Sequence, residues 1–178
     1  FFKTLIKWTS LFLFITILLR CIMRRRDREV EDIKKIEEIV SSARFMHLGL
    51  FDGDYPYVVP LHYGYKLNEE KFIFYMHSAK EGHKLDCINK NENVFVEIDK
   101  DENIITANTA CGHGAEYECV MCRGKASIVE DIEEKIEALE VLMKVQTDKE
   151  FKVTEEMTKS VVVIKVLAED ISAKVRVR

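Results

Sequence analysis

The sequence predicts a mainly β (α+β) fold, an antiparallel β-barrel with peripheral helices. Segments of alternating apolar and polar residues follow one another with short turns between them, which favours antiparallel pairing. About six or seven segments read as strands and two or three as helices. The strands follow strands instead of alternating with helices, which argues against a parallel α/β fold. A chain of 178 residues can bury one core without disulfide or metal support.

The start of the chain differs from the rest. Residues 11–19 are nearly all apolar. This run is shorter than the roughly 20 residues that a membrane-spanning helix needs, and no small-residue cleavage site follows it. The composition changes at Met23. We therefore interpret residues 1–22 as an upstream-translated or non-native hydrophobic extension, with a membrane anchor as the alternative, and residues 23–178 as one domain.

Composition and charge exclude some function classes. The formal net charge is −4, and beyond one short basic run at 24–28 nothing suggests a nucleic-acid footprint, so no nucleic-acid partner is expected. The five cysteines form no recognisable secreted framework. We therefore expect free thiols and a cytoplasmic location. A membrane is a partner only if residues 1–22 are a genuine anchor.

The first half of the domain is predicted to begin with a helix and continue as a meander of strands. Isoleucines at helical spacing predict a helix over residues 32–43. Strands are predicted over residues 45–51, 55–65 and 71–78. Pro56 and Pro60 cannot donate to a ladder, so the strand that holds them is expected at an edge or with a bulge.

The second half mixes helices and longer strands. The predicted elements are a short helix over residues 80–89, strands over 94–99, 117–129 and 160–172, and a helix that follows Asp131. Residues 100–114 are polar and are predicted to be irregular. Gly124 marks an expected bulge. Asp131 is the expected N-cap of the second helix, with Glu134 as its capping-box partner.

A cluster of sulfur and imidazole groups suggests a metal site. Cys111, His113, Cys119 and Cys122 supply the ligand types of zinc. However, Cys119 and Cys122 lie three apart in a predicted strand, so their side chains point to opposite faces. A second pair of cysteines at this spacing is missing, and no βαβ pattern supports a redox pair. We interpret these cysteines as small apolar residues and predict no metal ligand.

The turn after the strand at 71–78 has the donors of an anion site. Ser78 offers a hydroxyl, Lys80 and Lys84 offer positive charge, and Gly82 lets the backbone approach a ligand at a helix start. A solvated turn with scattered lysines explains the same residues equally well. His77 alone is compatible with either a structural or a catalytic role.

The order and spacing of four motifs resemble the pyridoxamine 5′-phosphate oxidase-like flavoproteins, most closely their nitroimidazole-resistance branch. The motifs are MRRRDREV at 23–30, PYVVPL at 56–61, FYMHSAKEGHKLD at 74–86, and YECV with the following GKA at 117–126. The resemblance extends from Met23 to about Ala173. It implies an antiparallel split β-barrel that forms a homodimer and binds FMN near the subunit interface.

The resemblance also implies roles for particular residues. Ser78, Ala79 and Lys84 would hold the FMN phosphate, which agrees with the donors found in that turn. The other residues implied to lie against the cofactor are Pro60, Leu61, His77, Tyr117, Cys119 and Val120. His77 would face the flavin and the substrate and is the predicted catalytic residue. Cys119 departs from the family, which commonly has serine there, and a thiol is a weaker hydrogen-bond partner than a hydroxyl.

The function expected on this basis is an FMN-dependent oxidoreductase that passes electrons or hydride to a small-molecule acceptor such as a nitro-aromatic. In such enzymes the cofactor carries the redox chemistry and the protein positions it. Two alternatives remain. One is a non-catalytic protein that binds flavin or heme, and the other is a zinc protein that uses the cluster at residues 111–122.

Overall fold

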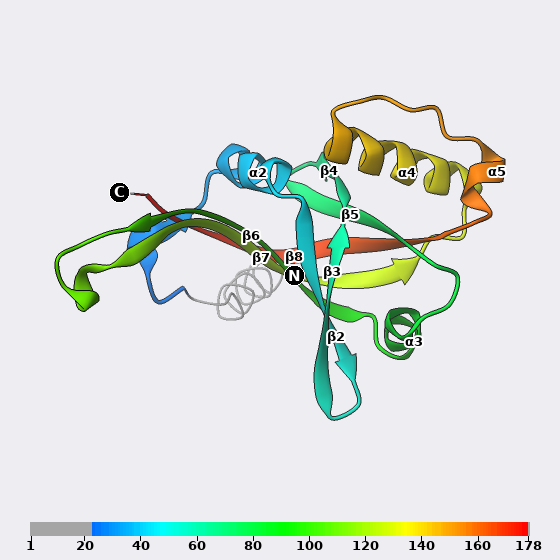
Figure 1. Cartoon of the computed structure of the whole chain (residues 1–178). Coiled ribbons are helices and arrows are strands. Elements are labelled where there is room, and N and C mark those ends of the chain that lie inside the picture. Colours follow the sequence, from blue (N-terminus) through cyan, green and yellow to red (C-terminus); the bar gives the residue numbers. More distant parts are fainter. Residues whose placement is uncertain (1–22, 178) are drawn as a thin grey trace, which may run out of the picture.

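An antiparallel sheet organises the computed structural model, which describes residues 23–177 (Figure 1). The strands follow the order β3-β2-β6-β7-β8-β5-β4, and β1 pairs with β8. Within the described residues no ladder joins the two outer strands, β3 and β4, so the barrel is split and not closed. This arrangement confirms the predicted fold class.

The bounds of the elements are as follows. The strands are β1 (Glu29–Val30), β2 (Phe45–Asp52), β3 (Tyr55–His62), β4 (Gly64–Asn68), β5 (Lys71–Ser78), β6 (Asn93–Ile105), β7 (Gly114–Ile128) and β8 (Val162–Arg176). The helices are α2 (Ile33–Ser42), α3 (His83–Lys90), α4 (Ile132–Thr147) and α5 (Glu155–Thr158), with 3-10 turns η1 (Arg26–Arg28) and η2 (Ala110–Gly112).

The hydrophobic extension expected at residues 1–22 lies outside the described part of the chain, and its interpretation stays a prediction. Across residues 23–177, none of the helices has both the length and the apolar character needed to cross a membrane.

The strand predicted over residues 55–65 is in fact two strands. β3 lies at the edge of the sheet, as its two prolines predicted, and the chain turns at Tyr63 into β4. Tyr63 is fully buried and donates a hydrogen bond to the carbonyl of Val40. At Gly64 a Cβ would lie 2.5 Å from the backbone of Leu142, so a glycine is needed where α4 crosses β4. This close approach of a helix was not visible in the local pattern.

The segment predicted to be irregular, residues 100–114, is so only in part: residues 100–105 and 114 belong to the paired strands β6 and β7, and residues 106–113 connect them. β6 and β7 stay paired as far as Ile105 opposite Gly114, with one register shift near Asn103. Figure 1 shows this arm projecting beyond the rest of the sheet. Because no core covers the arm, its strands lack the apolar alternation that identifies a strand in sequence.

Two local predictions in the second half are confirmed. The ladder between β7 and β8 shifts register at Gly124, as expected of a bulge. Asp131 caps α4 by accepting a hydrogen bond from the Glu134 N–H at 2.8 Å. The Glu134 carboxylate contacts Tyr75 and Lys165 instead of closing the capping box, which ties α4 to β5 and β8.

The main core lies between α2, α3 and the inner face of the sheet. Its largest fully buried side chains are Tyr63, Phe72, Phe74, Ile39, Met46, Leu48, Met76, Ile98 and Ile164. A smaller cluster around Tyr75 and Ala138 lies beneath α4, which runs along β4 and β5 (Figure 1). The opposite face of β3, β2, β6 and β7 carries exposed apolar side chains, among them Phe51, Val58 and Phe95. We call this surface the outer face.

Candidate functional site

The turn between β5 and α3 brings together the residues predicted to hold a phosphate. Ser78 ends β5 with 4% of its surface exposed, and its Oγ has no hydrogen-bond partner among the described residues. A buried hydroxyl without a partner costs about 1–3 kcal/mol. Ser78 Oγ is therefore suited to form a hydrogen bond with an oxygen atom of a ligand.

The start of α3 supplies further donors beside Ser78. Gly82 is the N-cap with φ at 153°, a backbone conformation that favours glycine. The N–H groups of the first helical turn have no intrahelical acceptor and carry partial positive charge. Lys84 is partly buried, and its Nζ lies 4.0 Å from the place that a Gly82 Cβ would occupy. A hydroxyl, a helix start and an ammonium group thus lie along one short turn, with Ala79 exposed between them.

His77 and Ser78 point to opposite faces of β5, since Ser78 is buried and His77 is exposed. Tyr75 shares the face of His77 but lies beneath α4, where its hydroxyl donates to Glu134 Oε1 at 3.1 Å. Burial and this carboxylate raise the pKa of Tyr75 above its usual value. His77 is therefore accessible to a small molecule and Tyr75 is not.

Pro60 and Leu61 also lie on opposite sides of their strand. Leu61 packs with Tyr57 and Val59 against the main core, as the alternation predicted. Pro60 faces outward and pairs in register with His47 on β2. Only Pro60 of the predicted pair therefore presents its side chain on the outer face.

The outer face has a polar centre that sequence reasoning missed. His47 Nδ1 lies 2.9 Å from Glu97 Oε2 and 3.8 Å from Asp99 Oδ1. Cys119 donates its thiol hydrogen to Glu97 Oε1 across 3.5 Å. Burial, followed by the charge of Glu97, raises the pKa of the Cys119 thiol to about 12. These side chains come from three strands, and only the register of the sheet places them together.

The predicted cofactor residues on β3 and β7 are not neighbours within one chain. Pro60 and Cys119 lie on strands separated by β2 and β6. Three strand spacings place them roughly 14 Å apart. Val120 is fully buried in the core, so its side chain does not reach the outer face.

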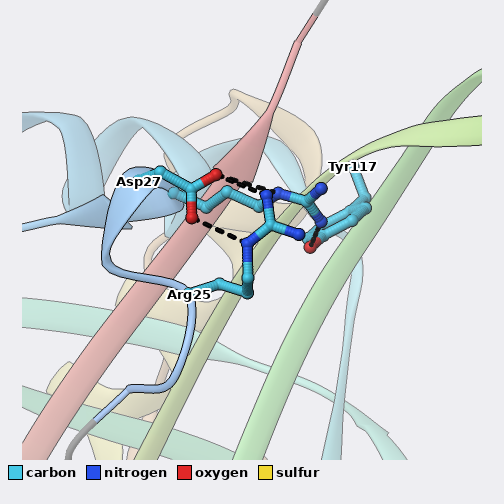
Figure 2. A network of polar contacts seen from close by, with 4 residues as sticks. Arg25, Asp27 and Tyr117 are labelled. Carbon is cyan, nitrogen blue, oxygen red and sulfur yellow. Dashed lines mark hydrogen bonds and ion pairs between the residues drawn. The ribbon is translucent and has the colours of Figure 1, made fainter.

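Tyr117 is held by the basic N-terminal run, which is also one of the four motifs of the family resemblance. Arg28 Nη1 donates to the Tyr117 hydroxyl at 3.0 Å. Figure 2 shows Tyr117 beside Arg25 and Asp27 of the same network. In the same network Arg25 pairs with Asp27. The hydrogen bond from Arg25 lowers the pKa of Asp27 to about 2. The basic run thus anchors the N-terminal segment to β7.

The structure separates the cysteines that first suggested zinc. Cys111 is exposed in η2, and Cys122 is buried on the inner face while Cys119 points outward, as strand alternation predicted. Burial raises the pKa of Cys122 to about 12. Among the described residues, no group with metal-ligand geometry includes Cys111 or Cys122. A different group does include a cysteine: Asp52, His83 and Cys87.

Comparisons with known proteins give the chain its relatives. The family model described as pyridoxamine 5′-phosphate oxidase matches residues 32–175. Among curated proteins, none matches the chain at the level of significance applied.

Three solved structures show how the fold recurs. A candidate 5-nitroimidazole antibiotic resistance protein from Bacteroides thetaiotaomicron VPI-5482 is 32% identical, with 83% of this chain and 86% of that chain covered and a TM-score of 0.71. The flavocytochrome Anf3 from Azotobacter vinelandii is 17% identical, with coverage of 88% and 73% and a TM-score of 0.72. A FAD and heme binding protein from Mycobacterium smegmatis is 11% identical, with coverage of 83% and 73% and a TM-score of 0.71.

The latter two similarities show the fold alone, whereas the Bacteroides protein agrees with the branch that the motifs resembled. The family match spans most of the described residues, including the turn at Ser78 and the strands that carry Pro60 and Cys119. The chain therefore belongs to the pyridoxamine 5′-phosphate oxidase family.

Proposed function

We propose that this protein is an FMN-dependent oxidoreductase that transfers electrons or hydride to a small electrophile such as a nitro-aromatic compound. The observation that carries the proposal is the buried, unpartnered hydroxyl of Ser78 beside the start of α3, in a chain of this family. The similarity to the Bacteroides protein supports the class of acceptor. When bound, the flavin supplies the redox chemistry, and the protein supplies position and charge.

The residues of the turn hold the phosphate end of the cofactor. Ser78 Oγ would donate to one phosphate oxygen, and the N–H groups at the start of α3 would donate hydrogen bonds to the others. Lys84 adds a charge-assisted hydrogen bond, which is stronger than a neutral one. Ala79 lies between these donors. Its side chain is small, so the ligand can approach the Ala79 main chain.

The strands flank the ring system of the cofactor. Pro60, Tyr117 and Cys119 offer side chains on their exposed faces, whereas Leu61 and Val120 turn inward and offer only their backbone. β3 is an edge strand, so main-chain donors and acceptors on its outer side are open to a ligand.

His77 is the group that we assign to proton transfer or to orienting the acceptor. Its side chain is exposed, and among the described residues no hydrogen bond or ion pair holds it. An imidazole can donate or accept a proton near neutral pH. A positioned general acid of this kind contributes about 10²-fold to 10⁴-fold in rate.

A second copy of this chain is the partner that we propose for the outer face. Phe51, Val58 and Phe95 expose 57%, 57% and 45% of their surfaces there. They line an apolar depression of about 730 Å³ between β2, β3 and β6. An apolar patch of this kind on a soluble protein usually marks an interface. A homodimer that meets here would also bring outer-face residues of both copies together, as cofactor binding near the subunit interface requires. A cytoplasmic location is a separate part of this proposal.

The test is to add FMN to the full-length protein, remove free ligand and record an absorption spectrum. We expect about one protein-bound flavin per chain. After the bound flavin is reduced anaerobically with stoichiometric dithionite, a 5-nitroimidazole should reoxidise it faster than oxygen does in a parallel aerobic sample.

A protein that stays colourless with FMN would overturn the cofactor assignment. Parallel incubations with FAD and with heme identify the competing cofactor in that case. If FMN binds but no electrophile reoxidises it faster than oxygen, the protein is a flavin carrier and the enzymatic proposal fails.

A further inference from the structure

A second cluster of polar side chains lies where the end of β2 meets α3. Asp52 is the last residue of β2, and His83 and Cys87 lie one turn apart on α3. Asp52 Oδ2 lies 2.8 Å from His83 Nε2, and Cys87 Sγ lies 3.7 Å from the same nitrogen. The three ligand atoms all lie within 4.8 Å of one another. This cluster takes no part in the proposed flavin chemistry.

The contacts to His83 exclude one familiar interpretation of a Cys, a His and an Asp. In a catalytic triad the acid binds one ring nitrogen of the histidine, and the nucleophile binds the other. Here Asp52 and Cys87 both approach Nε2. A proton cannot be relayed through the ring between two groups on one nitrogen. Three different ligand atoms that converge on one point are instead the geometry of a metal site.

Rigid elements position each of the three side chains. His83 and Cys87 have the i,i+4 spacing that places both on one face of a helix. Asp52 is fixed by the hairpin, where it pairs with Tyr55. The ring of Tyr57 packs against the His83 ring with centroids 5.0 Å apart, which sets the plane of the imidazole. The cluster is therefore organised without a ligand.

The two contacts to His83 can be compared with the distances in a tetrahedral zinc site, and the third separation, between Asp52 and Cys87, is within 4.8 Å. Bond lengths of 2.0–2.3 Å and tetrahedral angles imply about 3.3 Å between nitrogen and oxygen ligands and about 3.6 Å between nitrogen and sulfur. The separation of Cys87 Sγ from His83 Nε2, 3.7 Å, already fits. The Asp52–His83 distance of 2.8 Å must open by about half an ångström. The Asp52 side chain is 44% exposed and can make that movement.

The surroundings agree with a cation that has affinity for sulfur. Cys87 is 2% exposed and approaches from the protein side, whereas His83 and Asp52 approach from the solvent side. Asp52 is the strongest charge acting on Cys87, while Lys90 and Asp86 place one positive and one negative charge near it. A thiolate, an imidazole and one carboxylate select zinc or cobalt over magnesium or calcium, which prefer oxygen alone.

We propose that Asp52, His83 and Cys87 form a three-ligand site for Zn²⁺, with a water molecule as the fourth ligand. The cation would bind the Cys87 sulfur as thiolate, the neutral His83 ring through Nε2, and one Asp52 oxygen. Each ion bound releases the thiol proton to solvent, and the remaining ring hydrogen stays on Nδ1. The open fourth position resembles catalytic zinc sites more than structural ones.

The experiment uses Co²⁺ as a spectroscopic probe on the full-length protein, after treatment with a chelator and without FMN. We expect one Co²⁺ per chain, with a thiolate-to-cobalt charge-transfer band and the intense ligand-field bands of tetrahedral coordination. Added Zn²⁺ should displace the cobalt and abolish both signals.

Variants locate the site. Cys87→Ser should remove the charge-transfer band, and Asp52→Asn and His83→Gln should each weaken cobalt binding by at least about tenfold, because even outer-shell partners contribute about 10-fold to 100-fold to metal affinity. Because Cys87 is buried and its variant could unfold, Asp52→Asn at the exposed position gives an independent test on folded protein.

Matched controls come from the polar centre of the outer face, where His47, Glu97 and Asp99 form the second group with metal-ligand geometry within residues 23–177. Cys119→Ser and Glu97→Gln should leave the cobalt spectrum unchanged, and so should Lys84→Ala, which separates this site from the phosphate turn. Absence of a charge-transfer band overturns the proposal. So does a band that survives Cys87→Ser, or one that disappears in Cys119→Ser.

Discussion

Cys119 on β7 donates its thiol hydrogen to Glu97 on β6, with 3.5 Å between Sγ and Oε1. Burial, the negative charge of Glu97 and this hydrogen bond raise the pKa of the thiol to about 12. The thiol is therefore protonated at neutral pH. On the outer face it acts as a hydrogen-bond donor and not as a nucleophile.

The cysteines should differ in reactivity because thiolate is the reacting form. We expect iodoacetamide to modify exposed Cys111 first in folded protein at about pH 8, while Cys119 and Cys122 stay unmodified over the same period. Peptide mass spectrometry measures each site. A denatured sample, in which these thiols should react alike, is the control. Modification of Cys119 at the rate of Cys111 would show that the hydrogen bond to Glu97 does not hold its proton.

Gly64→Ala should destabilise the fold because the new Cβ would meet the α4 backbone at 2.5 Å. Overpacking of this kind costs about 1–3 kcal/mol, which lowers the melting temperature by about 2–12 °C in a domain of this size. Gly49→Ala is the matched control, since its Cβ would come no closer than 3.3 Å to the Phe95 carbonyl. Equal melting temperatures for the two variants would contradict the close crossing of α4 over β4.

The fold was predictable wherever one face of an element is buried. The edge position of β3 followed from its prolines, and the bulge followed from Gly124. The paired arm at Ile104 was missed because both of its faces are exposed to solvent, so its sequence lacks the alternation of apolar and polar residues that marks a strand. The turn at Tyr63 was missed because its cause is the packing of α4, a contact with a distant part of the chain.

The site was predictable where its residues are close in sequence. Ser78 and Lys84 are six positions apart, so a local motif identifies them together. Glu97 and His47 meet through the register of β2 and β6, which sequence does not provide. The pair His83 and Cys87 did carry a signal, namely i,i+4 spacing, but the third group, Asp52, comes from another element.

The proposed homodimer should dissociate when charge enters its apolar patch. Val58→Glu places a carboxylate among exposed apolar side chains on the outer face, opposite Gly49, and burying that charge at a dimer interface is unfavourable. Sedimentation velocity should show a dimer for the parent protein and a monomer for the variant. Met157→Glu on α5, at a side chain of similar exposure, is the control. A parent protein that sediments as a monomer refutes the interface.

Lys84→Ala should weaken FMN binding without unfolding the protein. Removal of a hydrogen bond to a charged group costs about 1.5–3 kcal/mol, which corresponds to roughly 10-fold to 150-fold in Kd. Fluorescence titration of FMN measures the change. Lys90→Ala removes the same charge from the far end of α3 and should leave the affinity nearly unchanged. Equal affinities of the two variants would remove Lys84 from the phosphate site.

His77→Ala separates catalysis from structure. The side chain is exposed and, among the described residues, has no hydrogen bond or ion pair, so its removal should change the free energy of unfolding by less than about 0.5 kcal/mol. If His77 donates a proton to the acceptor, the rate of flavin reoxidation by a nitro-aromatic should fall by about 10²-fold or more, with FMN affinity unchanged. His113→Ala removes an exposed histidine from the turn between η2 and β7. It should alter neither the free energy of unfolding nor the rate of flavin reoxidation. If the His77 variant keeps full activity, solvent donates the proton and His77 has no catalytic role.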